Sequence, residues 1–333
     1  MSKKIALTGD RPTGKLHFGH YAGSLKTRLA LQGKYEQFVM IADTEALTHN
    51  AERASHIREN TFEVLCDYLA VGLDPKKTTI FLRSQIPELF ELTGYFLNLV
   101  TLSRAEQNPT VKTEMREKGF SRNVPLGFLT YPVSQSADIL LFRADVVPVG
   151  EDQFPMVEQA NEIAEKFNRI YGQVLKKAKP LRSATGRLSG IDGKSKMSKS
   201  LGNAIFLSDS PEEVRRKVML MYTDPEHIRV SDRGHVKGNV VFEYLDAFDP
   251  KRSEVAKLKA QYQKGGLGDV VLKHRLIGVL EELLAPMRVR RAKAAKNRAK
   301  TLDILARGTR RARAAAESTM RGVRKAMHLD YNW

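Results

Sequence analysis

An apolar run, a glycine turn and the start of a helix follow one another in Ile5-Ala6-Leu7-Thr8-Gly9-Asp10-Arg11-Pro12-Thr13-Gly14-Lys15-Leu16-His17-Phe18-Gly19-His20. Further apolar runs typical of buried strands occur at 38–43, 78–82 and 146–150. Helical patterns separate the runs, at 20–31, 54–71, 87–102 and 132–142. Strands that alternate with helices predict an α/β domain with a parallel sheet.

The pattern changes after about Asn203. Ser210 followed by Pro211 is a typical helix start, and further helices are expected at 242–248, 267–284 and 309–327. In the last of these, 3–4 spacing places five apolar residues on one face: Ala312, Ala316, Met320, Val323 and Met327. We therefore expect two domains, an α/β domain over residues 1–203 and a mainly α-helical domain over residues 204–333.

Charge is concentrated near the end of the chain. The 333 residues carry a formal charge of +17, with 55 basic and 38 acidic residues. Between Met287 and Ala326, 14 Lys and Arg face only two acids, Asp303 and Glu317. A solvated helix face would explain a mixture of basic and acidic residues. Such an excess of basic residues instead predicts contact with a polyanion, and we expect nucleic-acid contact in the C-terminal half.

The single cysteine, Cys66, excludes an intramolecular disulfide framework and is expected to be a packed core thiol. The N-terminus has no apolar signal-peptide region, and no stretch is long enough to span a membrane. The sequence therefore predicts a cytoplasmic protein.

The first candidate site is the turn that contains His17, Gly19 and His20. It follows the first strand and opens the first helix, where free backbone N–H groups favour an anion. Both imidazoles can donate to phosphate oxygens, and Gly19 would let a flat adenine ring lie against the backbone. Two histidines in a loop are more often surface residues, so this motif alone leaves the choice open.

The second candidate site is Lys196-Met197-Ser198-Lys199-Ser200, a small loop between glycine-containing segments. A solvated basic turn is the plain interpretation. The functional one is a mobile clamp whose ammonium groups stabilise charge that develops on a leaving pyrophosphate.

The third candidate site is Val147-Pro148-Val149-Gly150-Glu151-Asp152-Gln153, where a strand ends and a helix begins. The carboxyl ends of parallel strands are where ligands bind. Asp152 and Gln153 could hold ribose hydroxyls or orient a substrate, although an acidic N-cap alone would look the same.

Together the three sites resemble class I aminoacyl-tRNA synthetases. His17–His20 is similar to the HIGH signature with Phe for Ile, and Lys196–Ser200 matches KMSKS letter for letter. Their order and spacing resemble the tyrosyl/tryptophanyl subgroup, and the resemblance runs from end to end. Four segments resemble the tryptophanyl enzymes: 9–14, 131–139, 147–153 and 238–242.

The resemblance implies a Rossmann-like catalytic domain and a helical domain that binds the tRNA anticodon. It implies catalytic roles for His17, His20, Lys196 and Lys199. It assigns ATP contacts to Arg11, Pro12, Thr13, Gly19, His20, Gly150, Glu151, Asp152, Leu188, Lys196, Met197, Ser198, Lys199 and Ser200. It assigns Asp138 to the indole N–H, and the rest of the amino-acid pocket to Tyr131, Gln135, Gln153, Val147 and Val149.

The resemblance further implies ATP as a substrate with Mg²⁺, no prosthetic group, no metal site of the protein's own, and L-tryptophan and tRNA(Trp) as partners. It also implies a homodimer. Pro87–Leu102 is a candidate interface, with ordinary core as the alternative.

Three other functions stay open at this point. Tyr131, Gln135 and Asp138 also reproduce the spacing of tyrosyl enzymes, Gln135 stands where many tryptophanyl enzymes have Met, and Leu7 where some have Phe. A different nucleotidyltransferase would share the first loop but not Lys196–Ser200. A non-catalytic paralogue that binds tryptophan or RNA would retain the same residues.

Overall fold

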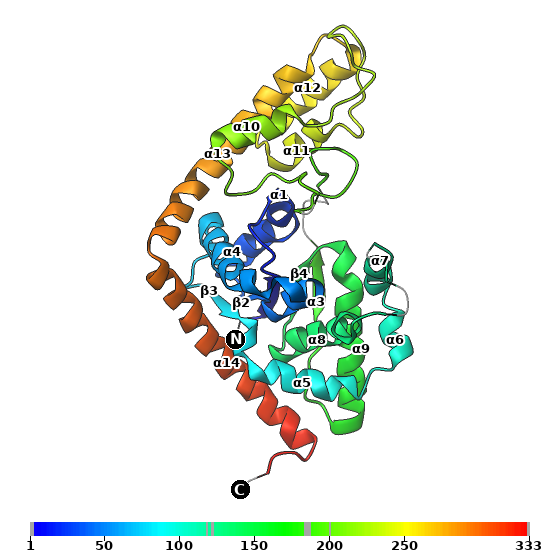
Figure 1. Ribbon diagram of the computed structural model, residues 1–333, viewed down its shortest axis with the longest axis vertical. Coiled ribbons are helices and arrows are strands. Elements are labelled where there is room, and N and C mark those ends of the chain that lie inside the picture. Colours follow the sequence, from blue (N-terminus) through cyan, green and yellow to red (C-terminus); the bar gives the residue numbers. More distant parts are fainter. Residues whose placement is uncertain (1–2, 118, 121–122, 183–187, 200, 332–333) are drawn as a thin grey trace.

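The computed structural model describes residues 3–117, 119–120, 123–182, 188–199 and 201–331. Its centre is a parallel sheet of order β3-β2-β1-β4-β5 (Figure 1). The strands are β1 (Ile5–Asp10), β2 (Glu36–Ile41), β3 (Thr78–Leu82), β4 (Val146–Val149) and β5 (Lys179–Arg182). The parallel α/β fold predicted from the alternating pattern is confirmed by this sheet.

The strand order indicates where a ligand would bind at the edge of the sheet. β1 pairs with β2 over its whole length, from Ile5 opposite Glu36 to Asp10 opposite Ile41, and with β4 on its other side. The chain winds outward from β1 to β3 and then returns to β4, so the order reverses between β1 and β4. Ligands of open parallel sheets bind at the carboxyl ends of the strands at such a reversal.

Helices cover both faces of the sheet. The first segment of helix is continuous through α1 (Phe18–His20), a π-helical turn at Tyr21–Leu25 and α2 (Lys26–Leu31). The other helices of this part are α3 (Leu47–Asn50), α4 (Ile57–Val71), α5 (Pro87–Leu97), α6 (Leu102–Glu106), α7 (Pro109–Glu117), α8 (Leu126–Leu141) and α9 (Phe154–Tyr171). Short 3-10 turns occur at 44–46, 51–56, 83–85 and 151–153. Cys66 is fully buried on α4, as expected for a core thiol.

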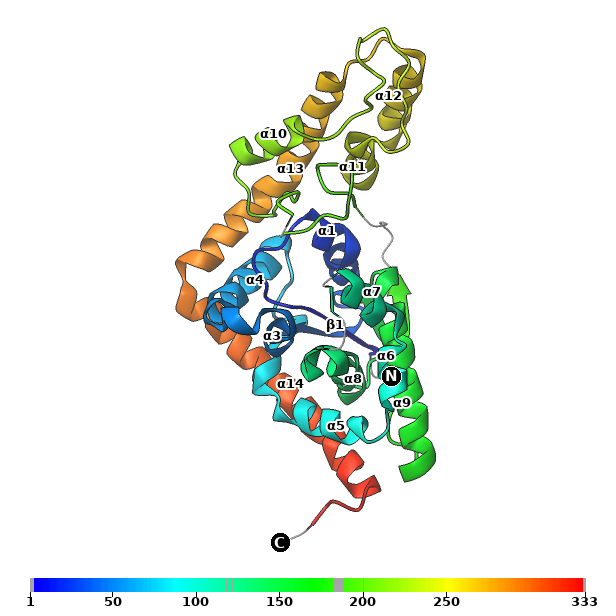
Figure 2. The ribbon, with the colours of Figure 1, turned by 45° about the vertical axis from the view of Figure 1, so that its right-hand side comes forward.

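The second half is helical, as predicted. It contains α10 (Pro211–Met219), α11 (Val240–Phe248), α12 (Arg252–Lys264), α13 (Asp269–Lys296) and α14 (Arg298–Ala326). Ser210 caps α10, because its side chain accepts a hydrogen bond from the backbone N–H of Glu213. α10 to α12 form one end of the molecule, and α13 runs from there back along the sheet domain (Figures 1 and 2).

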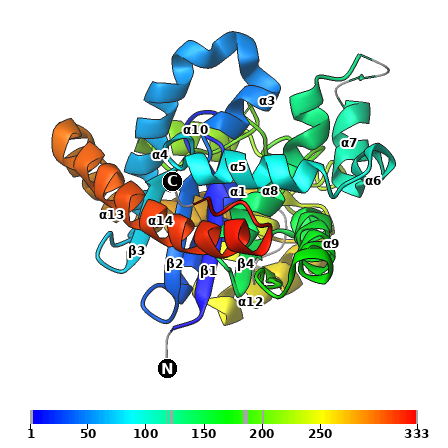
Figure 3. The same cartoon turned by 90° about the horizontal axis from the view of Figure 1, so that it is seen from below.

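The last helix returns to the sheet. α14 packs beside β3 and crosses the sheet domain below the strands (Figure 3). Its predicted apolar face is confirmed, since Ala312, Ala316, Met320 and Val323 are buried in the same core as Phe38 and Phe81. Residues 298–326 therefore share a core with the first half, whereas α13 packs against α4, and α10 and α11 pack against α13. The assignment of residues 204–333 to a tRNA-binding domain stays a prediction.

Many cations of the basic C-terminal segment hold these helices in place. Arg291 bridges the carboxylates of Asp67 and Glu63 on α4, and Asp67 is completely buried. Arg298 pairs with Glu59, Arg313 with Glu88 and Arg324 with Glu91, so acids of the first half meet arginines of the last two helices. Within the described residues Lys293, Lys296, Lys300 and Arg310 make no ion pair.

Some element boundaries differ from the sequence prediction. β5 has the sequence Lys-Pro-Leu-Arg, an edge strand without an apolar run, and we did not predict it. The helix predicted at 87–102 ends at Leu97, and α6 begins at Leu102 behind Thr101, whose hydroxyl accepts from the N–H of Arg104. No helix among the described residues is long and apolar enough to cross a membrane.

Candidate active site

Two adjoining cavities open at the carboxyl ends of β1 and β4. The first, of about 360 Å³, lies between β1, β4 and α8. The second, of about 420 Å³, lies between α1 and the segment that contains Lys196. They share the lining residues Asp10, His20, Ser24 and Gly150, so the two cavities meet where β1 ends. The fold thus brings together all three candidate sites of the sequence.

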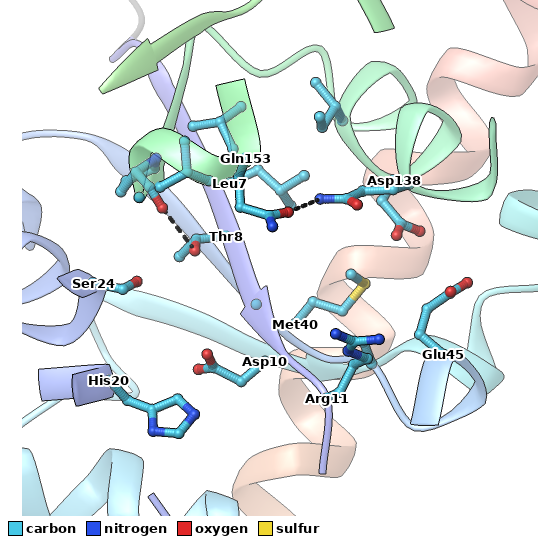
Figure 4. A pocket seen from close by; sticks show the side chains of 18 of the residues that line it. Leu7, Thr8, Asp10, Arg11, His20, Ser24, Met40, Glu45, Asp138 and Gln153 are labelled. Carbon is cyan, nitrogen blue, oxygen red and sulfur yellow. Dashed lines mark hydrogen bonds between the residues drawn. The ribbon is translucent and has the colours of Figure 1, made fainter. Parts of the chain in front are cut away.

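The first cavity combines apolar walls with four carboxyl side chains, those of Asp10, Glu45, Glu114 and Asp138. Leu7, Met40, Val147 and Val149 contribute apolar surface. Asp138 of α8, 2% exposed, faces this cavity with its carboxyl group (Figure 4). Apolar walls with a few placed polar groups fit a flat aromatic ligand, and the buried Asp138 carboxyl group can accept a hydrogen bond from its N–H or O–H group.

Arg83 and Glu45 set the charge of Asp138. The Asp138 Oδ1 atom accepts a hydrogen bond from Arg83 Nε at 2.9 Å. Burial raises the pKa of Asp138, Arg83 lowers it and Glu45 raises it, which leaves the pKa at about 7. Within the described part of the chain the Oδ2 atom makes no hydrogen bond, so this oxygen is available to a ligand.

The other residues predicted for the amino-acid pocket also line this cavity. The Tyr131 hydroxyl donates to Glu114 Oε2 at 3.1 Å, and burial together with this carboxylate raises the pKa of Tyr131. Gln135 Nε2 donates to Gln153 Oε1 at 3.4 Å, which joins α8 to the turn after β4. Val147 and Val149 form part of the wall of this cavity, and the binding of an amino acid there stays a prediction.

The two histidines of the first loop face the second cavity as neutral donors. The Nδ1 atom of His17 accepts from the N–H of Gly19 at 3.1 Å, and that of His20 accepts from the N–H of His17 at 3.2 Å. An imidazole whose Nδ1 is an acceptor carries its proton on Nε2. Burial lowers the pKa of His17 to about 2, with His20 and Lys199 adding to the shift, and burial lowers that of His20 to about 4.

The structure explains why residue 19 is a glycine by its contact with His17, whereas the sequence suggested contact with an adenine ring. A Cβ atom at Gly19 would lie 2.8 Å from the His17 ring. Glycine at this position therefore lets the His17 imidazole fold back over the start of the helix and cap it. The expected contact between Gly19 and an adenine ring stays a prediction.

The lysine loop lies directly against the first loop. Lys199 Nζ donates to the carbonyl of Gly14 at 2.8 Å, and the N–H of Gly19 points at Met197 Sδ at 3.3 Å. Burial lowers the pKa of Lys199 to about 8. Lys196 lies 3.9 Å from the Asp152 carboxylate across the second cavity. Ser200 lies outside the described residues.

The remaining predicted ATP contacts divide into two groups. The second cavity is lined by Gly150, Glu151, Asp152, Leu188 and Met197, and the first by Arg11 and Thr13. Pro12 is buried and lines neither cavity, and Ser198 lies beside them with its N–H bound to Asn203. No group of three or more His, Cys, Asp or Glu among the described residues is arranged to hold a metal ion.

Several residues at the site were missed in the sequence. Asp10 ends β1 and lines both cavities. Burial would raise its pKa, but the guanidinium of Arg28 and the hydroxyl of Tyr68, each 2.7 Å from its Oδ2, help to hold the pKa well below its usual range. Arg83 follows β3, and its position at a strand end could have revealed it. Asn203 organises the lysine loop through Asp192, Ser195 and Ser198, and no sequence pattern indicated this.

Comparison with known proteins places these features in a family. The profile of the family described as tRNA synthetases class I (W and Y) matches residues 2–285. A tryptophan–tRNA ligase of Streptococcus mutans is 55% identical over 99% of this chain and 100% of its own length. One of Clostridium longisporum is 54% identical over 99% and 98%. A tryptophanyl-tRNA synthetase structure from Campylobacter jejuni, complexed with ADP and tryptophan, superposes with a TM-score of 0.84 at 28% identity over 98% of this chain and 100% of that one.

Proposed function

The chain belongs to the family of class I tRNA synthetases for tryptophan and tyrosine, and we propose on this premise that it is an ATP-dependent ligase that joins L-tryptophan to tRNA(Trp). The names of the relatives that match over nearly the whole chain favour tryptophan over tyrosine. The observation that carries the proposal is the buried Asp138 carboxyl group in a cavity with apolar walls, which adjoins a second cavity lined by Lys196, His17 and His20.

In the first step, the tryptophan carboxylate attacks the α-phosphorus of ATP in line, and pyrophosphate leaves. The substrate carboxylate is the nucleophile, so the protein needs none and contributes positioning and charge stabilisation. Tryptophan fills the first cavity and donates its indole N–H to Asp138. Tyr131, Gln135 and Gln153 line the part of the cavity that holds its amino-acid end, between the walls made by Val147 and Val149.

ATP fills the second cavity. Its ribose lies against Gly150, Glu151 and Asp152, and its adenine against Leu188 and Gly19. The Nε2–H groups of His17 and His20 donate to the phosphate chain, while Lys196 and Lys199 stabilise the charge that develops on the leaving pyrophosphate. ATP brings Mg²⁺ on its phosphates, where the ion offsets further negative charge.

In the second step, a terminal ribose hydroxyl of the tRNA attacks the activated carbonyl and AMP leaves. The helical end of the molecule, within residues 204–333, contacts the anticodon end. The unpaired cations Lys293, Lys296 and Lys300 contact backbone phosphates, which give affinity and salt dependence rather than base recognition.

The proposal includes a homodimer that works in the cytoplasm. The neighbouring helices α5, α6 and α8 expose four large apolar side chains, Phe90, Leu97, Leu102 and Leu126. Exposed apolar patches of this kind mark protein–protein contacts. Light scattering on the purified protein would test the assembly, with twice the chain mass expected.

Aminoacylation of a tRNA(Trp) transcript tests the function as a whole. Radiolabelled tryptophan should become acid-precipitable in the presence of ATP and the transcript, and labelled tyrosine should not. Charging with tyrosine would reassign the substrate. If the protein binds tryptophan or tRNA but charges neither amino acid, a non-catalytic role would replace the proposal.

A further inference from the structure

Arg83 is a buried arginine beside the first cavity, although the sequence did not assign it to the amino-acid pocket. It directly follows β3, is 1% exposed, and does not line either cavity. A buried guanidinium is costly unless its charge and its N–H groups are matched. The groups that contact the guanidinium of Arg83 therefore indicate its role.

Each nitrogen of the Arg83 guanidinium has a partner around the first cavity. Nε donates to Asp138 Oδ1 at 2.9 Å, and one terminal nitrogen donates to the Thr44 hydroxyl at 2.6 Å. The other donates to the Ser134 hydroxyl at 2.5 Å and lies 3.2 Å from Glu45 Oε1. The ring of Phe90 covers the group, with its centroid 5.3 Å from the guanidinium carbon. These contacts fix Arg83 in one orientation.

This arrangement determines how Asp138 meets a ligand. Arg83 donates to Oδ1 and does not itself line the cavity, so Oδ2 is left for a ligand there. Asp138 has a second acid nearby, Glu45, and no other described cation contacts its carboxylate. On the far side of the cavity, Glu114 and Tyr131 interact with each other. Arg83 is thus the group that favours the ionised carboxylate of Asp138 against burial and Glu45.

We infer that Arg83 is a positioning residue for substrate choice: it holds the Asp138 carboxyl group through Oδ1 with Oδ2 turned to the cavity, and so favours aromatic substrates that present a ring N–H. The inference rests on the proposed function, since it assumes that tryptophan occupies the first cavity. Arg83 does not touch the substrate in this account and acts through Asp138.

Two ligands that differ only in the ring N–H distinguish the effect of Arg83 on N–H recognition from a general distortion of the pocket. L-tryptophan and 3-(benzothiophen-3-yl)-L-alanine have nearly the same size and shape, but the second has sulfur in place of the indole N–H. Binding of each is measured calorimetrically at pH 7.5 without ATP, in the wild type, in Arg83→Gln and in Arg83→Lys. Arg324→Gln, which removes another arginine–carboxylate pair away from the cavities, controls for stability.

The wild type should prefer tryptophan, and Arg83→Gln should lose about 10–100-fold of this preference, as expected for a hydrogen bond to a charged group. Binding of the sulfur analogue should change less than threefold. Arg83→Lys retains the positive charge but lacks the planar set of guanidinium N–H donors, so it should recover part of the preference for tryptophan. The control variant Arg324→Gln should keep all of this preference. The preference of Arg83→Gln should also return partly as the pH rises from 7 to 9, because Asp138 then ionises without help.

Equal weakening of both ligands in Arg83→Gln would show a merely structural role and overturn the inference. An unchanged preference would also overturn it while the proposed function stands. If the wild type does not bind tryptophan at all, the proposed function itself fails, which is a separate outcome.

Discussion

The ammonium group of Lys199 donates a hydrogen bond to the backbone carbonyl of Gly14 at 2.8 Å and thereby joins the two signature loops across 185 residues of sequence. The contact places a cation beside the imidazoles of His17 and His20. Binding of ATP would offer Lys199 a stronger, charged acceptor than this neutral carbonyl. The loop can therefore exchange one partner for the other as the substrate binds.

Replacement of Lys199 by alanine should lower the rate of ATP–pyrophosphate exchange by about 10²–10³-fold, the range for loss of one group that stabilises transition-state charge. The affinity for tryptophan, measured without ATP, should stay within a factor of two. Exchange near the wild-type rate would remove Lys199 from the mechanism.

The affinity for ATP should fall as the pH rises above about 8. Burial lowers the pKa of Lys199 to about 8, so the free protein loses this charge above that pH. A phosphate oxygen binds the protonated form, so affinity is full below pH 8 and declines above it, by at most about tenfold per pH unit. Titrations between pH 7.5 and 9.5 test this, and Lys199→Arg, which stays charged, should show a flatter profile.

Much of this site could be predicted because its residues lie in order beside strand ends. Gly9–His20 begins at the end of β1 and Val147–Gln153 includes the end of β4, and the sheet order brings these two strand ends together. Arg28 and Tyr68 could not be inferred from the sequence, since each is a buried charge or hydroxyl whose partner, Asp10, comes from another segment. The return of α14 to the sheet depends on the same kind of distant pairing.

His17 and His20 should remain neutral throughout the physiological range in the ATP-free protein. Burial lowers the pKa of both, and their Nδ1 atoms accept backbone N–H groups. Two-dimensional ¹⁵N NMR of the imidazoles, assigned with His17→Asn and His20→Asn, should show the Nε2–H tautomer for both and no titration between pH 5 and 8. An inflection near pH 6.5 for either ring would contradict the assigned hydrogen bonds.

Gly308 is the point of closest approach between α14 and the sheet. A Cβ atom there would lie 1.8 Å from the carbonyl oxygen of Ile80, and the next residue, Thr309, accepts the N–H of Leu82. Gly308→Ala should therefore lower the free energy of unfolding by about 1–3 kcal/mol, as overpacking does.

Gly278→Ala on α13 is the matched control for this prediction. Gly278 is also inside a long helix, but open space surrounds the position of its Cβ. This substitution should raise stability by about 0.5–1 kcal/mol through helix propensity. Thermal unfolding of both variants gives the comparison, and equal stability changes would show that the contact with Ile80 is not tight.

Asp138→Ala should weaken discrimination between tryptophan and phenylalanine far more than it changes the affinity for ATP. Phenylalanine leaves the Asp138 oxygen unpaired, and a site that is built to bind a donor rejects analogues without it by up to about 10⁴–10⁵-fold. The ratio of kcat/KM for the two amino acids in the exchange assay measures this. An unchanged ratio would mean that another group selects the indole.

The most direct test of the account is ATP–[³²P]pyrophosphate exchange by the purified protein with each of the twenty amino acids in turn and no tRNA. The account predicts exchange with tryptophan and none above background with the other nineteen. Exchange with tyrosine instead would keep the fold and the chemistry but assign Asp138 to a phenol, and the absence of exchange with every amino acid would contradict the proposal that this site activates a substrate.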